Sequence, residues 1–275
     1  MLRVTALYVY PVKSCRGFAV NTAAIDARGL VGDRRFLVVD AQSLFLTQRV
    51  HPRMALIETA LTADFLTLAS ASQGSVSIPL SGNRHPVSEV PVTVWKDTVL
   101  ADDCGDEPAR WLSDFLRLPC RLVRAGSAYS RPVPARKIPA SLGLLASSSH
   151  EVSFADAFPF MVISEESLAN LNARLATPLP MNRFRPSLVV AGGAPYAEDG
   201  WTRCKIGEVV FHGATRCGRC VVTTTDQLTA ARAQEPLRTL ATYRRDEDGT
   251  VMFGRNLIHE TKTGRLSVGD TVELL

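Results

Sequence analysis

Short segments rich in β-branched and aromatic residues fill most of the amino-terminal half of the chain, and they limit the possible folds more than any other feature. Glycine, asparagine or aspartate separates successive segments, at spacings that are typical of an all-β barrel or sandwich. The predicted strands are residues 4–10, 35–40, 55–60, 65–68, 75–79 and 90–95. The amino-terminal half is therefore expected to be rich in β-structure.

Helical patterns are few and begin later in the chain. One follows Asp106, a candidate N-cap, has Pro108 in its first turn and ends at Pro119. A second begins after Ser164, which we interpret as its N-cap because two glutamates and then a leucine periodicity follow. Residues 235–245 carry a third helical pattern.

The carboxy-terminal half mixes these helices with further strands. Residues 125–153 are rich in Ser, Pro and Ala and indicate a long connector or an active-site loop. Strands are predicted at residues 187–191, 208–212, 221–225 and 251–259, and after a turn at Gly269 and Asp270. The fold class predicted by these patterns is mixed α+β and β-rich.

The bulk composition excludes several classes of function. The 275-residue chain has a net charge of +4, from 31 basic and 27 acidic residues, which is too small for a nucleic-acid or membrane-surface site. Its longest charge-free stretch, residues 65–83, is too polar to span a bilayer, and its first residues alternate in polarity rather than forming a signal peptide. The six cysteines are irregularly spaced, unlike a disulfide framework. We therefore expect a cytoplasmic protein with reduced thiols.

The sequence CGRC at residues 217–220 is the sharpest local motif, and three interpretations compete for it. A thioredoxin-like redox pair needs its first thiolate at the start of a helix, whereas the run VVTTT that follows favours a strand. A structural zinc site needs four ligands, for which Cys204 and His212 are candidates. In the third interpretation both cysteines are small buried hydrophobic residues.

The flanking arginines weaken the third interpretation. Arg216 and Arg219 favour the thiolate form of a neighbouring cysteine, and a thiolate is either reactive or a ligand for a soft or high-valent metal. The motif by itself does not decide between these possibilities.

The stretch RCGRCVVTTTD resembles the cysteine motif of the MOSC superfamily, in the branch that contains the mitochondrial amidoxime reducing component and its bacterial relatives. Other segments resemble that family in the same order: LYVYPVKSCRG at residues 7–17, GLVGDRRFLVVD at 29–40, FPFMVISEESLANLN at 158–172, NRFRPSLVV at 182–190, EPLRTLATYRR at 235–245, FGRN at 253–256 and the closing SVGDTVELL. The resemblance implies an N-terminal β-barrel domain at residues 1–122 and a mixed β-barrel MOSC domain with a few helices at residues 123–275. A cofactor cleft is expected between them.

The resemblance also implies a molybdenum cofactor and the residues that hold it. The second cysteine of the family's motif ligates molybdenum and corresponds to Cys220, which is therefore the expected metal ligand and catalytic residue. The residues that match cofactor-binding positions are Lys13, Ser14, Arg34, Arg185, Ser187, Gly218, Arg219 and Asn256. The basic and hydroxyl groups among them suit the terminal phosphate of the pterin, because a buried dianion requires cationic partners.

Simpler roles remain open for several of these residues. Lys13 and Arg34 also suit solvated strand ends, and Arg185 suits a pair with a surface carboxylate. The resemblance leaves undecided whether Cys217 or Asp226 has a catalytic role, and Asp226 also suits a turn.

The chain departs from the family pattern at two positions. Gln227 stands where the family often has proline, and Phe158 stands where it often has a polar residue. Neither change affects the expected metal ligand, but both alter the contacts expected with substrate.

The implied function is reduction of N-hydroxylated compounds, such as amidoximes, hydroxylamines and N-hydroxylated bases, by oxygen-atom transfer to molybdenum. A separate donor protein, such as a ferredoxin, a flavoprotein or a b-type cytochrome, is expected to supply the electrons, because no cysteine follows Cys220 to hold an iron–sulfur cluster. The alternative is a non-catalytic protein that binds or carries the molybdenum cofactor or sulfur, since MOSC domains also occur fused to sulfurases.

Overall fold

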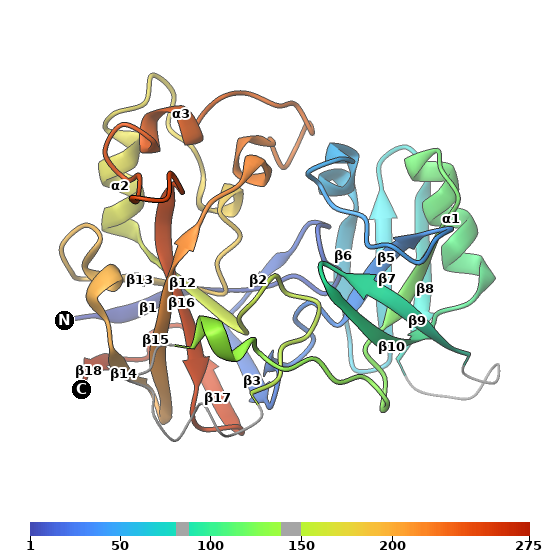
Figure 1. Cartoon of the computed structure of the whole chain (residues 1–275), viewed down its shortest axis with the longest axis horizontal. Helices are drawn as coiled ribbons and strands as arrows, with labels where there is room; N and C mark the ends of the chain where they lie inside the picture. Colours follow the sequence, from blue (N-terminus) through green and yellow to red (C-terminus); the bar gives the residue numbers. More distant parts are fainter. Residues whose placement is uncertain (81–87, 139–149) are drawn as a thin grey trace.

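The computed structural model describes residues 1–80, 88–138 and 150–275. Its strands form four sheets in two lobes, which lie side by side in Figure 1. The larger lobe contains an eight-stranded sheet with the order β18-β14-β15-β16-β12-β13-β1-β2. These strands are β1 (Arg3–Val9), β2 (Phe18–Val20), β12 (Phe160–Ser164), β13 (Leu188–Ala191), β14 (Arg203–Ile206), β15 (Val209–Gly218), β16 (Met252–His259) and β18 (Val272–Leu274).

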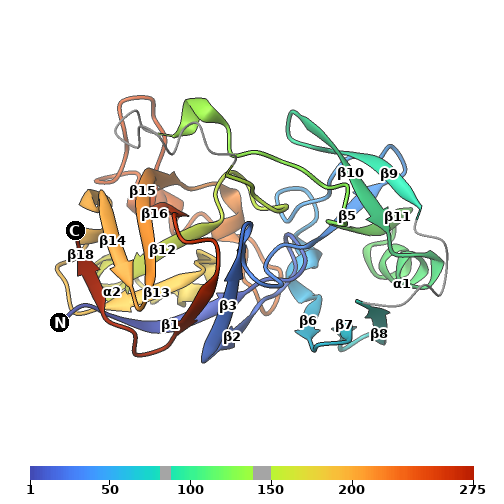
Figure 2. The same ribbon diagram turned by 90° about the horizontal axis from the view of Figure 1, so that it is seen from below.

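The larger lobe is built from both ends of the chain. β1 lies between β13 and β2 inside the eight-stranded sheet and pairs antiparallel with both. A three-stranded sheet joins β17 (Gly264–Ser267) to β3 (Thr22–Asp26) and β4 (Gly29–Leu30). The two termini lie close together in Figures 1 and 2, and the Val272 amide donates to the Leu2 carbonyl oxygen over 2.9 Å. By its pairing, the beginning of the chain thus belongs to the lobe formed by the carboxy-terminal half.

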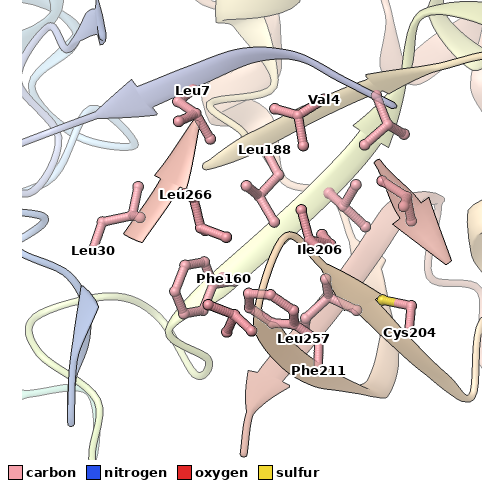
Figure 3. Packing of buried hydrophobic residues seen from close by; sticks show 14 of the residues in the cluster. Val4, Leu7, Leu30, Phe160, Leu188, Cys204, Ile206, Phe211, Leu257 and Leu266 are labelled. Carbon is pink, nitrogen blue, oxygen red and sulfur yellow. The ribbon is translucent and has the colours of Figure 1, made fainter. Parts of the chain in front are cut away.

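A buried apolar cluster holds this lobe together. An irregularity between Val4 and Ala6 lets Val4 and Leu7, which are three residues apart, face the same interior. Figure 3 shows Val4, Leu7 and Phe160 in that interior, where each is at most 1 % exposed. The rings of Phe160 and Phe211 meet edge to face with centroids 5.1 Å apart. Burial of each such side chain contributes about 2 kcal/mol and ties the first strand to the carboxy-terminal half.

The smaller lobe packs a helix against two sheets. A four-stranded sheet has the order β5-β11-β10-β9, and a three-stranded sheet has the order β6-β7-β8. The strands are β5 (Phe36–Asp40), β6 (Glu58–Leu61), β7 (Phe65–Ser70), β8 (Gly74–Pro79), β9 (Glu89–Val94), β10 (Asp97–Asp103) and β11 (Cys120–Arg124). Helix α1 (Asp106–Leu116) contacts β8 and β11 and buries Trp111, Leu112 and Phe115 in the core of this lobe.

The remaining helices are short. They are α2 (Glu165–Asn172), α3 (Leu237–Leu240) and the 3-10 helices η1 (Pro52–Leu56), η2 (Ala135–Lys137), η4 (Met181–Arg183), η5 (Ala197–Gly200) and η6 (Val221–Thr224). Helix α2 lies against β12 and β13, and the prediction that Ser164 is its N-cap is confirmed, because its hydroxyl accepts from the Ser167 amide at 3.1 Å. In the described ranges, no helix combines the length and apolar character needed to cross a bilayer.

The mixed α+β, β-rich fold class is confirmed, but the barrels are not closed. Each sheet of the described strands has two edges, so the lobes are packed open sheets. Other local predictions were also wrong: residues 52–56 form η1 before β6 begins at Glu58, and Gly105 is the N-cap of α1. The sequence patterns also did not predict eight of the described strands, which are β2, β3, β4, β10, β11, β12, β14 and β17. Helix α3 covers only Leu237–Leu240 of the predicted 235–245. Part of the expected connector, residues 139–149, lies outside the described residues.

The strand predicted at residues 221–225 is instead the 3-10 helix η6. The Thr223 hydroxyl donates to the Cys220 carbonyl oxygen at 2.9 Å, and the Thr224 hydroxyl donates to the Val221 carbonyl oxygen at 2.8 Å. These local bonds offer the backbone an alternative to strand pairing, which explains why β-branched residues form a turn here.

Candidate functional site

A cavity of about 600 Å³ is lined by residues from both lobes. All the residues predicted for the site line this one cavity: Lys13, Ser14, Arg34, Arg185, Ser187, Gly218, Arg219, Cys220 and Asn256. Segments that are far apart in the sequence meet there because β1 pairs with β13 beside β12 and β16. The fold therefore brings together every residue on which the sequence interpretation depends.

Both cysteines of the CGRC motif face the cavity. Cys220 is the N-cap of η6, and Cys217 lies at the end of β15. Both side chains are half-buried and line the cavity, and all six cysteines of the chain carry free thiols. The interpretation of these two cysteines as buried hydrophobic residues is therefore wrong.

The structure also places the two further candidate zinc ligands, Cys204 and His212, in different surroundings. Cys204 is 1 % exposed and belongs to the core of the larger lobe, whereas His212 lies 2.8 Å from Glu260. Within residues 1–80, 88–138 and 150–275, no group of three or more His, Cys, Asp or Glu side chains is placed to hold a metal ion. The thioredoxin-like interpretation fails as well, because Cys217 ends a strand and does not begin a helix.

Lys13, Arg49 and Asp156 form a charged cluster on the cavity wall. The Lys13 ammonium pairs with Asp156 and donates to the Phe154 carbonyl oxygen at 2.8 Å. Asp156 also accepts from Arg49 Nη2 at 3.0 Å. Burial lowers the pKa of Lys13, although Asp156 opposes this change. Burial in turn would raise the pKa of Asp156, but the two cations outweigh it and hold that pKa far below its usual range.

Arg49 connects this cluster to the cysteine. Burial by itself would lower the pKa of the Arg49 guanidinium, but Asp156 and Cys220 outweigh burial and raise that pKa. The Arg49 guanidinium thus places a positive charge beside the Cys220 sulfur. Arg49 comes from the segment between β5 and η1, so the smaller lobe supplies a cation to the Cys220 end of the cavity.

Arg34 and Arg185 form a second cationic group. Their guanidinium groups lie 4.4 Å and 4.3 Å from the centroid of the Tyr10 ring. Arg34 pairs with Asp33, donates to the Arg185 carbonyl oxygen at 3.1 Å and lies 3.5 Å from the Ser187 hydroxyl. Burial lowers the pKa of Arg185 to about 10. No carboxylate of the described residues forms an ion pair with Arg185, so the surface-pair interpretation of this residue is wrong.

Three of the predicted cofactor residues have a left-handed backbone conformation. The φ angles are 68° at Ser14, 49° at Arg34 and 55° at Arg185. Non-glycine residues rarely adopt this conformation, which costs about 1–3 kcal/mol and tends to persist at binding sites. The turns that carry these residues therefore point to a ligand and argue against ordinary strand ends.

The residues next to Cys220 are positioned by several hydrogen bonds. Arg219 Nη1 lies 2.9 Å from Cys217 Sγ, and Arg219 Nη2 donates to the Phe184 carbonyl oxygen at 2.5 Å. Asn256 on β16 donates to the Thr215 hydroxyl at 3.1 Å. The Arg219 side chain is thus oriented across the motif toward the first cysteine.

The structure shows the contacts of three residues whose roles the sequence left uncertain. Asp226 accepts from the Leu228 amide at 2.9 Å and is not among the residues that line the cavity, so it forms a turn. Gln227 is buried and exchanges hydrogen bonds with Gln48 at 3.1 Å and 3.2 Å. Phe158 lines the cavity and gives part of its wall an apolar surface.

The sequence interpretation missed Arg49 and Asp156. Neither residue has a local pattern that marks it, because each gains its partners through tertiary contacts with Lys13 and Cys220. One signal was present, since Asp156 lies just before the family-like segment at residues 158–172.

The described side chains fit a cofactor that combines a metal with a phosphate. The Cys220 sulfur, a soft metal ligand, lines the cavity together with the two cationic groups. The Arg219 Nε group, on the cavity wall, is buried without a hydrogen-bond partner among the described atoms. Buried cations and unpaired donors of this kind are stabilised by an anionic ligand.

Comparison with known proteins identifies the family. The profile of the MOSC N-terminal beta barrel domain matches residues 1–119, and that of the MOSC domain matches residues 149–273. The mitochondrial amidoxime-reducing component 1 of Mus musculus is 34 % identical over 285 residues, which cover 99 % of this chain and 82 % of that protein. Its Homo sapiens counterpart is 33 % identical over 287 residues, with the same coverage of both chains.

A different relative is much longer than this chain. The molybdenum cofactor sulfurase of Danio rerio is 32 % identical over 290 residues, which cover 98 % of this chain but 34 % of that protein. The profiles and the full-length relatives agree, and they show that the chain belongs to the MOSC family and carries a MOSC N-terminal domain followed by a MOSC domain.

Proposed function

We propose that this protein is a molybdenum-cofactor-dependent reductase of N-hydroxylated compounds. In this reaction the N–O bond breaks, two electrons and two protons are consumed, and an amine or amidine and water are released. The observation that supports it most directly is that the Cys220 thiol and both cationic groups open onto one cavity. Relatives named amidoxime-reducing components support the choice of substrate class.

Cys220 is the proposed molybdenum ligand. The proposed cofactor-binding residues are Lys13, Ser14, Arg34, Arg185, Ser187, Gly218, Arg219 and Asn256. When bound, the cofactor would supply two-electron redox chemistry at the cavity. Arg49 would place a positive charge beside Cys220, and the Phe158 and Phe184 side chains would exclude water from the reacting groups.

A separate donor would have to return the electrons after each turnover. A ferredoxin, a flavoprotein or a b-type cytochrome could fill this role. We also propose that the reaction takes place in the cytoplasm, because all six cysteines are free thiols.

Substitution of the two motif cysteines tests the proposal. The Cys220→Ser variant is expected to lose bound molybdenum and the reduction of benzamidoxime by an artificial donor while it remains folded, because serine does not supply a soft thiolate. The Cys217→Ala variant should retain most of its molybdenum, and it serves as the matched control. Full activity in Cys220→Ser would contradict the assignment, and equal metal loss in both variants would favour a paired-cysteine site.

The alternative function is a non-catalytic carrier of the molybdenum cofactor or of sulfur. The similarity to a molybdenum cofactor sulfurase supports it. A carrier would bind molybdenum and pterin in a Cys220-dependent way but would not reduce benzamidoxime or a hydroxylaminopurine. Turnover by the molybdenum-loaded wild-type protein therefore separates the two functions.

A further inference from the structure

An exposed tryptophan occupies an unusual place in the smaller lobe. Trp95 and Lys96 form the two-residue turn between β9 and β10, and Trp95 has a φ of 60°. Hairpin turns of this conformation favour asparagine, aspartate or glycine, because a bulky side chain is strained there. The Trp95 side chain is nevertheless 44 % exposed to solvent. A large apolar side chain is thus exposed at a turn position whose backbone conformation is unfavourable for a bulky residue.

Trp95 is linked to the proposed metal ligand through a single side chain. The Arg49 guanidinium lies 4.6 Å from the centroid of the Trp95 ring, and the same guanidinium interacts with Cys220. The Phe45 ring packs against Trp95 with a centroid separation of 5.0 Å. Trp95 itself does not line the cavity. Its exposed ring is therefore placed to contact a protein partner at the surface and not a substrate bound inside the cavity.

Other exposed apolar side chains lie on the segments that carry Cys220 and Arg49, or on the segment bonded to them. Val221 directly follows the proposed metal ligand and is 45 % exposed, whereas Val50 and Leu228 are each 71 % exposed. The segments that carry Val50 and Leu228 are held together, because Arg232 Nη2 donates to the Arg49 carbonyl oxygen at 2.5 Å. We call Val50, Trp95, Val221 and Leu228 the apolar rim.

Positive charge accompanies the apolar rim. Lys96 and Arg232 are exposed, and neither forms an ion pair with a carboxylate in the described parts of the chain. Unpaired cations on a surface attract and orient an acidic partner. Tryptophan and arginine are also the residues most enriched among those that dominate the binding energy of protein interfaces.

We propose that the apolar rim, with Lys96 and Arg232, is the docking surface for a small acidic electron-transfer protein. This inference rests on the proposed function, which requires two electrons per turnover from a donor. The donor would contact Trp95, which is separated from Cys220 by the Arg49 guanidinium. Lys96 and Arg232 would attract and orient the acidic face of the donor.

The Trp95→Asn variant tests this surface without disturbing the hairpin, because asparagine tolerates the left-handed conformation. The probe is a reduced acidic [2Fe–2S] ferredoxin, compared with reduced methyl viologen, in the reduction of benzamidoxime. The kcat/KM for ferredoxin is expected to fall about 10-fold, while the viologen-driven rate and the molybdenum content stay at wild-type values. Lys96→Glu should also lower the kcat/KM for ferredoxin and should weaken its dependence on salt.

Leu100→Thr and Arg110→Glu are the matched controls. Leu100 on β10 is as exposed as Trp95, Arg110 is exposed on α1, and neither lines the cavity. Both variants should leave the ferredoxin-driven rate unchanged. Wild-type kcat/KM for ferredoxin in Trp95→Asn and Lys96→Glu would overturn the docking surface, and so would a failure of ferredoxin to support wild-type turnover that viologen supports.

A failure of the reductase reaction itself would be seen separately. In that case the wild-type protein would not turn over with viologen, and the proposed function would fail. Calorimetric titration of ferredoxin into the wild-type and Trp95→Asn proteins still decides the docking surface, because weaker binding to the variant is expected whether or not substrate is reduced. Equal affinity for both proteins would refute the surface.

Discussion

Charge balance among single residues explains how the cavity can hold a dianion. Lys13 and Arg49 share the one carboxylate of Asp156, and Arg34 pairs with Asp33. Arg185 has no described carboxylate partner, so these two clusters hold four cations and two carboxylates, and Lys137, Arg216 and Arg219 also line the cavity. A phosphate ester carries a charge of about −1.5 to −2 at neutral pH. The excess of positive charge on the cavity wall therefore suits the terminal phosphate of the proposed cofactor.

His259 on β16 is a buried residue that should make stability depend on pH. Its Nε2 lies 2.7 Å from the Asp26 carbonyl oxygen, and its Nδ1 has no partner among the described atoms. Burial and then the positive charge of Lys262 lower the pKa of His259 to about 4, with a smaller contribution from His150. Protonation of the folded protein would place a second buried N–H group where no acceptor is described.

The expected pH dependence follows from this shift. An unfolded histidine has a pKa of about 6.5, so below that pH the unfolded chain binds a proton that the folded chain does not. The free energy of unfolding should fall as the pH decreases from about 6.5 toward 4, by at most about 3 kcal/mol. Urea unfolding at pH 7 and pH 5 measures this fall. In His259→Gln the fall should be much smaller, and an equal fall in both proteins would refute the role of His259.

At the scale of elements, helix α2 is too short to be stable by itself and depends on its amino-terminal contacts. Ser164 caps the Ser167 amide, and its hydroxyl lies 3.0 Å from a carboxylate oxygen of buried Glu198. The Ser164 amide also donates to Glu198 at 3.0 Å. The end of β12 and the start of α2 are thus joined by one polar network.

Ser164→Ala is expected to lower the free energy of unfolding by about 1–2 kcal/mol, because it removes the N-cap and one partner of a buried carboxylate. Chemical denaturation of the variant and the wild-type protein measures the difference. Ser75→Ala, at an exposed position on β8, is the control and should change stability by less than about 0.5 kcal/mol. A Ser164→Ala variant as stable as this control would contradict the capping role.

At the scale of the whole molecule, the two ends of the chain fold together. β1 lies inside the eight-stranded sheet, and β3 pairs with β17. Val4, Leu7, Ile25 and Leu30 are buried in the same cluster as the apolar residues of β12 to β18. The predicted boundary at residue 122 stays a prediction, but the carboxy-terminal half buries its core only with the help of the first thirty residues.

A fragment of residues 123–275 should therefore lack a cooperative unfolding transition, because it would expose the edge of β13 and the apolar cluster that β1 covers. Circular dichroism during thermal unfolding of the fragment and of the full chain measures this. A fragment that also contains residues 1–30, connected by a flexible linker, is the matched control and should recover a cooperative transition. Cooperative unfolding of residues 123–275 alone would show that the two ends fold independently.

Local patterns predicted much of this protein. Ten of the described strands and the helix after Ser164 overlap the predicted segments, and the nine predicted site residues line one cavity. Alternating polarity, capping chemistry and a family-like motif are local properties that a sequence displays directly. The predictions failed where a local competitor acts, as in η6, where threonine hydroxyls bond to nearby carbonyl oxygens.

The sequence by itself determined the β-rich class, the family-like motifs and the identity of the candidate thiol. Only the tertiary structure decided that β1 lies among carboxy-terminal strands, that Arg49 and Asp156 join Lys13 near Cys220, and that Trp95 stands beside them. The physical reason is that these contacts join residues more than a hundred positions apart or in different loops, and their partners are selected by the burial of a shared core and by charge pairing, which no local pattern encodes.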